Sequence, residues 1–228
     1  MTVEIELIFT LALNEVVREL VPRFEAKTGS KIVSQRVPTA RVVQRLNAGE
    51  TTDVVMLSAG ALEALIAARL IVPESRVDLA TCGVAVAVRA GARRPDMSSA
   101  ESLKRAVLDA KSIVYSTGPS GVYLQALFRR MGIEDAIAAK VKQVQGEPAG
   151  ALVARGEAEI GFQQMCELLP IAGIEIAGPL PPGIQEITRF AGGVHVAANA
   201  ADAAKALLDF FSDRDAASVM RRKGLDPV

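Results

Sequence analysis

The sequence contains no tryptophan, a single histidine and two cysteines, and aromatic residues make up only 4% of it. So few aromatic rings argue against a lectin-like site that stacks sugars on side chains. One histidine, His195, in an apolar run, together with two scattered cysteines, cannot form a zinc site, and it makes a hydrolase triad improbable. Cys82 and Cys166 lie in apolar surroundings without CxxC spacing, so we expect buried thiols rather than a disulfide.

The sequence has no net charge, since the 26 Lys and Arg residues are balanced by 26 Asp and Glu residues. No basic block is interleaved with aromatic residues, so we expect no nucleic-acid surface. No apolar run approaches the roughly 20 residues that span a bilayer, so we expect no membrane insertion.

Targeting and cofactor signals are absent as well. The amino end, MTVEIELIFT, has no basic region and no small-residue cleavage site, which predicts a strand rather than a signal peptide. As written, the chain is expected in the cytoplasm, and with a leader removed it would be expected in the periplasm. We expect no cofactor, and the GPSG turn lacks the lysine of a phosphate-binding loop. Ser120 lacks the G-x-S-x-G spacing of a nucleophile elbow, which argues against nucleophilic chemistry of that kind.

Hydrophobic residues make up 50% of the sequence, which is ample for packed cores. In two stretches, short apolar runs alternate with apolar residues at helical spacing, and this alternation predicts parallel strands covered on both faces. The predicted strands lie at 3–9, 31–35 and 53–57 in the first stretch, and at 113–115, 141–144, 159–163 and 174–176 in the second.

Two long extended runs without a helix, 77–90 and 186–197, flank the second stretch. We therefore predict an α/β fold class with two Rossmann-like lobes joined by two hinge strands, and a ligand cleft at the carboxyl ends of the strands. Lobe one would comprise 1–82 and 190–228, and lobe two 83–189.

The segment 111–131 combines a short strand, a turn and an amphipathic helix whose first residues are Ser120 and Gly121. Free backbone N–H groups and the positive end of a helix dipole stabilise an anion at such a position, and a glycine lets the ligand approach the backbone. For an isolated serine, capping of its own helix is the simpler explanation. Thr10 and Thr39 occupy similar strand-to-helix turns, however, so the three hydroxyls together predict an anion site.

Four further segments are FEAKTGSKI, LNAGETTDVVMLSAGALEAL, VARGEAEIGFQQ and FFSDRDAASVMRRKGLDP. With them the chain resembles periplasmic solute-binding proteins of the molybdate-binding type, the ABC-transporter substrate-binding class, which has aconitate-isomerase-like relatives. The resemblance covers essentially the whole chain and implies the type II periplasmic-binding-protein fold.

The resemblance also implies a set of ligand contacts. The two hydroxyl positions of lobe one resemble Thr10 and Thr39, and a backbone contact of lobe two falls near Gly146 and Glu147. The contact at the start of the helix in 111–131 falls at Ser120, with Gly121 beside it. The tyrosine that closes a molybdate site is matched by Gln164, which is a departure from the family pattern.

Two arginines near this predicted site favour a carboxylate over a tetrahedral oxyanion, because a guanidinium binds a carboxylate through two parallel hydrogen bonds. Arg41 follows the Thr39 turn, and it is equally well explained as a solvated residue of the first helical turn. Arg189 lies on the second extended run, where it either reaches the cleft or pairs with a structural acid.

The first functional hypothesis is a solute-binding protein that takes an organic di- or tricarboxylate in the interlobe cleft. Its expected partners are this small anion and, if the chain is exported, an ABC permease, and we expect a monomer. The alternative is a cofactor-independent isomerase of an unsaturated tricarboxylate on the same scaffold, with Glu147 nominated as its base. A second alternative is the binding of molybdate or another oxyanion.

Overall fold

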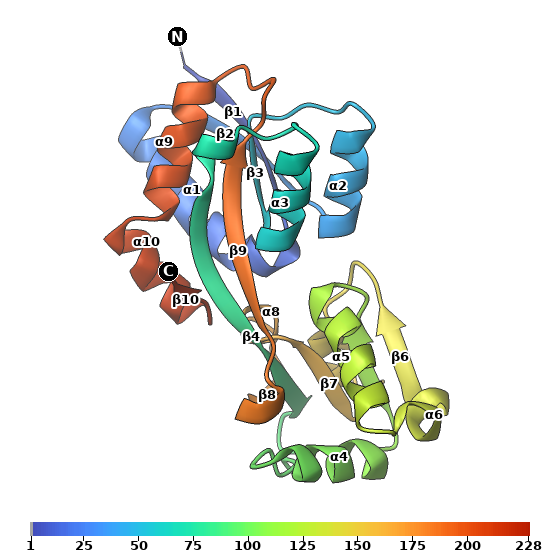
Figure 1. Cartoon of the computed structure of the whole chain (residues 1–228). Coiled ribbons are helices and arrows are strands. Elements are labelled where there is room, and N and C mark those ends of the chain that lie inside the picture. The colour runs from blue at the N-terminus through green and yellow to red at the C-terminus, as the bar shows by residue number, and fades with distance from the viewer. Residues whose placement is uncertain (1) are drawn as a thin grey trace. The chain divides into compact units, whose positions relative to one another are not determined.

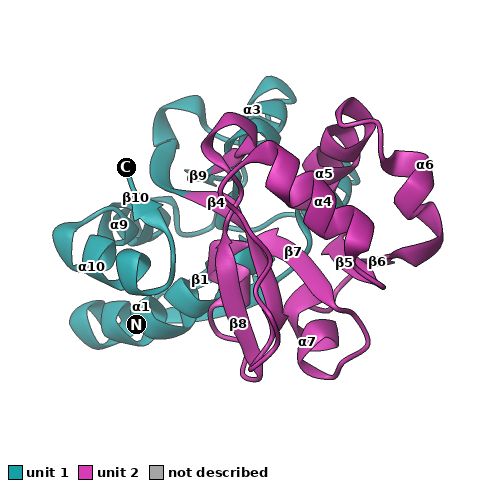
Figure 2. Ribbon diagram, turned by 90° about the horizontal axis from the view of Figure 1, so that it is seen from below, with its two compact units in different colours: residues 1–81, 189–228 teal, residues 82–188 magenta. Residues whose placement is uncertain are grey.

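The computed structural model describes residues 2–228, which divide into two compact units. Unit 1 consists of the residues up to Thr81 together with Arg189–Val228, and unit 2 is Cys82–Thr188 (Figure 2). Strands β4 (Val77–Arg89) and β9 (Ile187–Val194) carry the chain from one unit into the other. Both boundaries lie one residue before the positions expected from the sequence.

The sheet of unit 1 has the strand order β2–β1–β3–β9 (Figure 1). Strand β1 (Glu4–Phe9) pairs in parallel with β2 (Lys31–Arg36) and with β3 (Val54–Ser58), and β9 runs antiparallel to β3. The short β10 (Asp226–Pro227) pairs with the first part of β4. The three parallel strands therefore end at one common edge, which we call the carboxyl edge of unit 1.

Helices cover both faces of this sheet, as expected from β3, whose residues are apolar up to the final Ser58. Helices α2 (Thr39–Asn47) and α3 (Ala59–Ala67) pack on one face, and α1 (Asn14–Thr28), α9 (Ala201–Phe211) and α10 (Arg214–Arg222) lie on the other (Figure 1). Two 3₁₀ turns complete the unit, η1 (Leu11–Leu13) before α1 and η2 (Pro73–Ser75) before β4.

The sheet of unit 2 has the order β4–β7–β5–β6, with β8 (Ile174–Pro179) pairing with β4. Strand β5 (Ile113–Ser116) is parallel to β6 (Val141–Val144) and to β7 (Ile160–Gln164). These three strands end at the carboxyl edge of unit 2. Strand β4 is antiparallel to β7.

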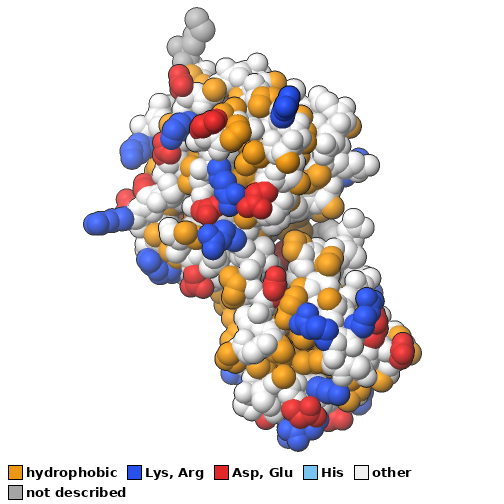
Figure 3. Space-filling view, in the orientation of Figure 1, with side chains coloured by type: hydrophobic (Ala, Val, Ile, Leu, Met, Phe, Trp, Pro, Cys, Tyr) orange, Lys and Arg blue, Asp and Glu red, His pale blue; other side chains and the backbone are white. Residues whose placement is uncertain are grey.

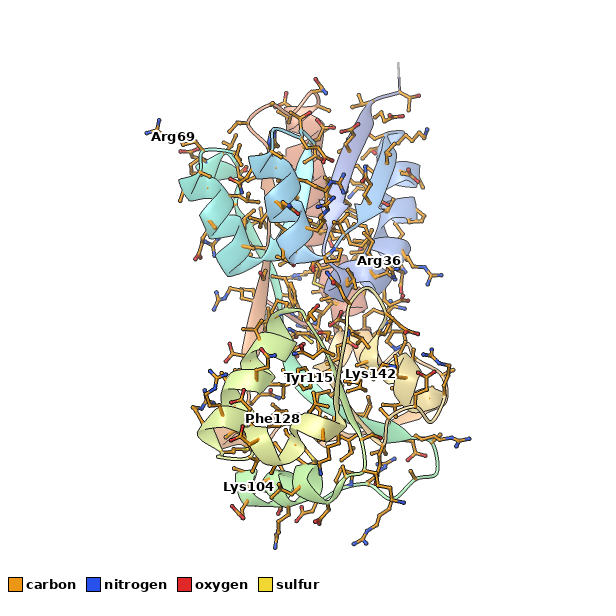
Figure 4. All side chains as sticks on the ribbon, turned by 90° about the vertical axis from the view of Figure 1, so that its right-hand side faces the viewer. Arg36, Arg69, Lys104, Tyr115, Phe128 and Lys142 are labelled. Carbon is orange, nitrogen blue, oxygen red and sulfur yellow. The ribbon has the colours of Figure 1, made fainter. Side chains whose placement is uncertain are left out.

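Helices α4 (Ala100–Asp109), α5 (Pro119–Arg130) and α6 (Glu134–Ile137) cover one face of this sheet, and α7 (Ala149–Ala154) and α8 (Met165–Leu168) cover the other. Short 3₁₀ turns follow α6 and β8, at Ala138–Lys140 and Pro182–Ile184. Figure 4 shows Tyr115 and Phe128 in the interior of the unit, where their ring centroids lie 6.1 Å apart.

Charged side chains of both signs are interspersed on the face of the molecule in Figure 3, without a large area of one sign. Within residues 2–228, no helix is both long enough and apolar enough to cross a membrane.

Candidate functional site

The carboxyl edge of unit 1 brings two of the predicted hydroxyls into contact. Thr10 follows β1 and is 7% exposed, and its Oγ1 lies 2.9 Å from the Oγ1 of Thr39, the first residue of α2. The backbone holds this arrangement, because the Thr10 N–H donates to the Met56 carbonyl and the Val37 N–H donates to the Phe9 carbonyl. Hydroxyls from two different turns thus form one neutral pair.

A third hydroxyl at this edge, Ser58, was missing from the sequence-based site. Ser58 ends β3 and is the N-cap residue of α3, yet its side chain makes no capping hydrogen bond. Three helices, η1, α2 and α3, begin at this edge, and the first N–H groups of a helix have no partner inside it. The sequence signal for Ser58 was the strand-to-helix position that it shares with Thr10.

Both arginines of the predicted site already interact with another side chain of unit 1. Arg41 is exposed and donates to Gln44 Oε1 one helical turn further along α2, at 2.6 Å. Arg189 Nη1 lies 3.2 Å from Asp78 Oδ2, and the two side chains are 53% and 29% exposed. Of the two readings of Arg189, the pairing with an acid is the one found, but this acid is partly exposed.

In unit 2, Ser120 lies inside the first turn of α5, where Gly118 is the N-cap residue. Because Gly118 and not Ser120 holds the N-cap position, the explanation that Ser120 caps its own helix is wrong. Ser120 is 2% exposed and lies at a helix start, where anions are stabilised.

Gly121 has a different role from the one expected. A Cβ built on it would lie 1.6 Å from the Ser116 carbonyl oxygen, so α5 starts in direct contact with the end of β5. The missing side chain thus allows the helix to pack on its own strand, and an approach of the ligand is not needed to explain the glycine.

The loop after β6 contains Gly146, whose φ of +80° suits glycine, and the exposed Glu147. Glu147 Oε1 accepts a hydrogen bond from Arg155 Nη1 at 2.6 Å, and both side chains are nearly half exposed. A solvated, ion-paired carboxylate is poorly suited to remove a proton from carbon. The geometry therefore does not support Glu147 as a base.

Gln164, the last residue of β7, is 3% exposed. Its Nε2 donates to Thr188 Oγ1 at 2.7 Å, while its Oε1 has no partner among the described residues. A hydroxyl can donate or accept, so Thr188 fits either orientation of the amide, and Gln164 can offer a ligand an acceptor or a donor. This buried, half-satisfied amide lies at the carboxyl edge of unit 2.

In the described residues, no three His, Cys, Asp or Glu side chains gather closely enough to hold a metal ion. Cys82 and Cys166 are buried and are not joined in a disulfide, as expected, and the Cys166 N–H donates to Cys82 Sγ at 3.5 Å. His195 lies beyond the amino end of β3, away from the carboxyl edge, and burial lowers the pKa of its ring.

Residues 6–226 match the family of bacterial extracellular solute-binding proteins, and the chain belongs to this family. Over 218 residues it is 38% identical to an aconitate isomerase from a Pseudomonas species, a match that covers 93% of this chain and 83% of that protein.

Solved structures show the same fold. The periplasmic molybdate-binding protein of Azotobacter vinelandii gives a TM-score of 0.81 at 17% identity, covering 97% of this chain and 98% of that one. The sulfate-binding protein SubI of Mycobacterium tuberculosis gives a TM-score of 0.79 at 14% identity, covering 99% and 87%. The predicted α/β fold of periplasmic binding proteins is confirmed.

Proposed function

We propose that this chain binds an unsaturated tricarboxylate and interconverts cis- and trans-aconitate. The observation that carries the proposal is the 38% identity to an aconitate isomerase along 93% of the chain. The molybdate- and sulfate-binding structures share only 17% and 14% of their residues with it, so they support the fold and leave the ligand open.

The reaction is a 1,3 proton shift. A base removes a proton from the methylene carbon of aconitate, the electron pair of that C–H bond forms a new double bond, and the old double bond accepts a proton at its far carbon. No atom or electron is gained or lost, and neither an oxidant nor a reductant is needed. The protein has to bind three carboxylates and supply one acid–base group.

Each unit supplies groups for the carboxylates. In unit 1 these are the Thr10–Thr39 hydroxyl pair, Ser58 and the starts of η1, α2 and α3. In unit 2 they are the hydroxyl of Ser120 at the start of α5, the backbone at Gly146 and the amide of Gln164. Arg41 and Arg189 would join them only by leaving their present partners.

Membership of a solute-binding family supports a second candidate function, the binding of a di- or tricarboxylate without turnover. In that case the protein would deliver its ligand to an ABC permease outside the cytoplasm. Both functions require the same carboxylate contacts, and they differ in whether the bound molecule reacts.

The deciding experiment is incubation of the purified protein with trans-aconitate in D₂O, followed by proton NMR. Appearance of cis-aconitate supports the isomerase, and heat-denatured protein serves as the control. A thermal-shift series with aconitate, citrate, succinate, molybdate and sulfate runs beside it, since a ligand at 100 times its Kd stabilises by about 2.7 kcal/mol. Stabilisation by aconitate without turnover would favour the binding protein. Stabilisation by molybdate or sulfate alone would overturn both functions.

A further inference from the structure

Glu167 is the third residue of α8, the helix that follows directly on Gln164, the last residue of β7. It therefore lies at the carboxyl edge of unit 2, the edge on which Ser120 and Gln164 also lie. In open α/β sheets, ligands bind outside this edge. No sequence motif marks Glu167 as a site residue. It differs from other glutamates only in its place at the end of β7 and in the groups around it.

The side chain of Gln163 and the backbone N–H of Gln164 face the Glu167 carboxyl and act to lower its pKa. Gln163 is itself fixed, since it is 2% exposed and its Oε1 accepts a hydrogen bond from the Ala149 N–H at 2.7 Å. The Gln163 amide therefore has its NH₂ group left for the glutamate. As a residue Glu167 is partly exposed, whereas its neighbours Gln163 and Gln164 are buried.

The electrostatic surroundings of Glu167 differ from those of the other acids near the predicted site. Glu147 is paired with Arg155, and Asp78 with Arg189. The groups that act on the Glu167 carboxyl include no cation among the described residues, and burial raises its pKa to about 7. The titratable groups that sense its charge are the thiols of Cys82 on β4 and Cys166 on α8.

We propose that Glu167 is the acid–base group that moves the proton in the isomerisation. As a carboxylate it takes the proton from the methylene carbon, the double bond shifts, and the resulting carboxylic acid returns the proton to the carbon at the other end of the three-carbon unit. This role rests on the proposed isomerase function. A group that must both accept and return a proton near neutral pH works best with a pKa near that pH.

A purely structural role for Glu167 has to be separated from this one. With Gln164 as N-cap and Glu167 as the third helical residue, the hydrogen bond to the Gln164 N–H is one half of a capping box. Glutamine serves equally well in that motif. Glu167→Gln therefore keeps the cap and removes the base, which makes it the informative variant, and Glu147→Gln is the matched control on the same edge.

The experiment compares wild type, Glu167→Gln and Glu147→Gln in kcat and KM for trans-aconitate from pH 5 to 9. For Glu167→Gln we expect kcat to fall by about 10²- to 10⁴-fold while the thermal shift with trans-aconitate persists. Wild-type kcat/KM should rise with pH around an apparent pKa of about 7, and the residual activity of Glu167→Gln should lose this dependence. We expect Glu147→Gln to stay within about threefold of wild type.

A second readout does not depend on activity. A carboxyl whose pKa is raised in the folded protein favours folding at low pH, and that contribution is lost as the pH rises toward about 7. Wild type should lose stability over this range in denaturant titrations, whereas Glu167→Gln should not. If Glu167→Gln fails to fold, Glu167→Asp replaces it, with reduced kcat and a retained pH dependence as the expected result.

The outcomes separate this proposal from the proposed function. A wild-type protein that binds aconitate without turnover overturns the isomerase and, with it, the role of Glu167. An active wild type with an equally active Glu167→Gln variant of unchanged pH dependence overturns the role of Glu167 alone. Loss of kcat together with loss of ligand binding would assign Glu167 to binding and would also contradict the proposal.

Discussion

Replacement of Thr10 by valine is the sharpest test of the hydroxyl pair in unit 1. The substitution keeps the shape of the side chain and removes Oγ1, which lies 2.9 Å from Thr39 Oγ1. A hydrogen bond to a charged ligand contributes about 1.5–3 kcal/mol, so we expect Kd for trans-aconitate to rise about 10- to 150-fold. Without ligand, only a neutral hydroxyl–hydroxyl contact is lost, and the free energy of unfolding should fall by about 1 kcal/mol.

Thr52→Val is the matched control for this substitution. Thr52 is 3% exposed and donates to the Glu6 carbonyl at 2.9 Å, but it precedes β3 and so lies at the opposite edge of the same sheet. We expect a similar loss of stability and an unchanged Kd, measured by calorimetric titration and urea denaturation. Equal effects of the two variants on Kd, or no effect of Thr10→Val, would refute the assignment of this edge as a ligand site.

Three further outcomes follow from the contacts described above. Gly121→Ala should destabilise the protein by about 3 kcal/mol or more in urea, because its new Cβ meets a backbone oxygen, and an unaltered midpoint would contradict that contact. Arg189→Ala should lower the free energy of unfolding by less than about 1 kcal/mol, since its ion pair is exposed, and a loss above about 3 kcal/mol in the same assay would mean that a buried acid had been left unpaired. In a thiol titration without reductant, Cys82 and Cys166 should react only after denaturation, whereas a chain with no reactive thiol even then would contain a disulfide.

The elements of the fold could be predicted because their signals are local. The apolar runs at 54–57 and 113–115 are buried in sheets covered on both faces, as short apolar runs between helices indicate. The Thr10 and Thr39 turns could be placed together for the same reason, since parallel strands end at one edge.

The site could be predicted only where no long-range partner decides the role of a residue. Arg189 pairs with Asp78, which is 111 residues away in sequence, and Glu147 pairs with Arg155 across a helix. Neither ion pair can be predicted from the spacing of residues in the local sequence. Glu167 escaped notice because burial, which no spacing rule records, raises the pKa of an ordinary helix-start glutamate.

The division of the chain has a consequence for its synthesis. Unit 2 is one uninterrupted segment, whereas unit 1 is completed only by Arg189–Val228. Strand β9 pairs with β3, and Phe210 of α9 packs against Phe24 of α1 with ring centroids 5.4 Å apart. Until the end of the chain has been synthesised, the first part of unit 1 therefore has an unpaired edge at β3 and an uncovered face on α1. On the ribosome, therefore, the segment in the middle of the chain should fold before the segment that is made first.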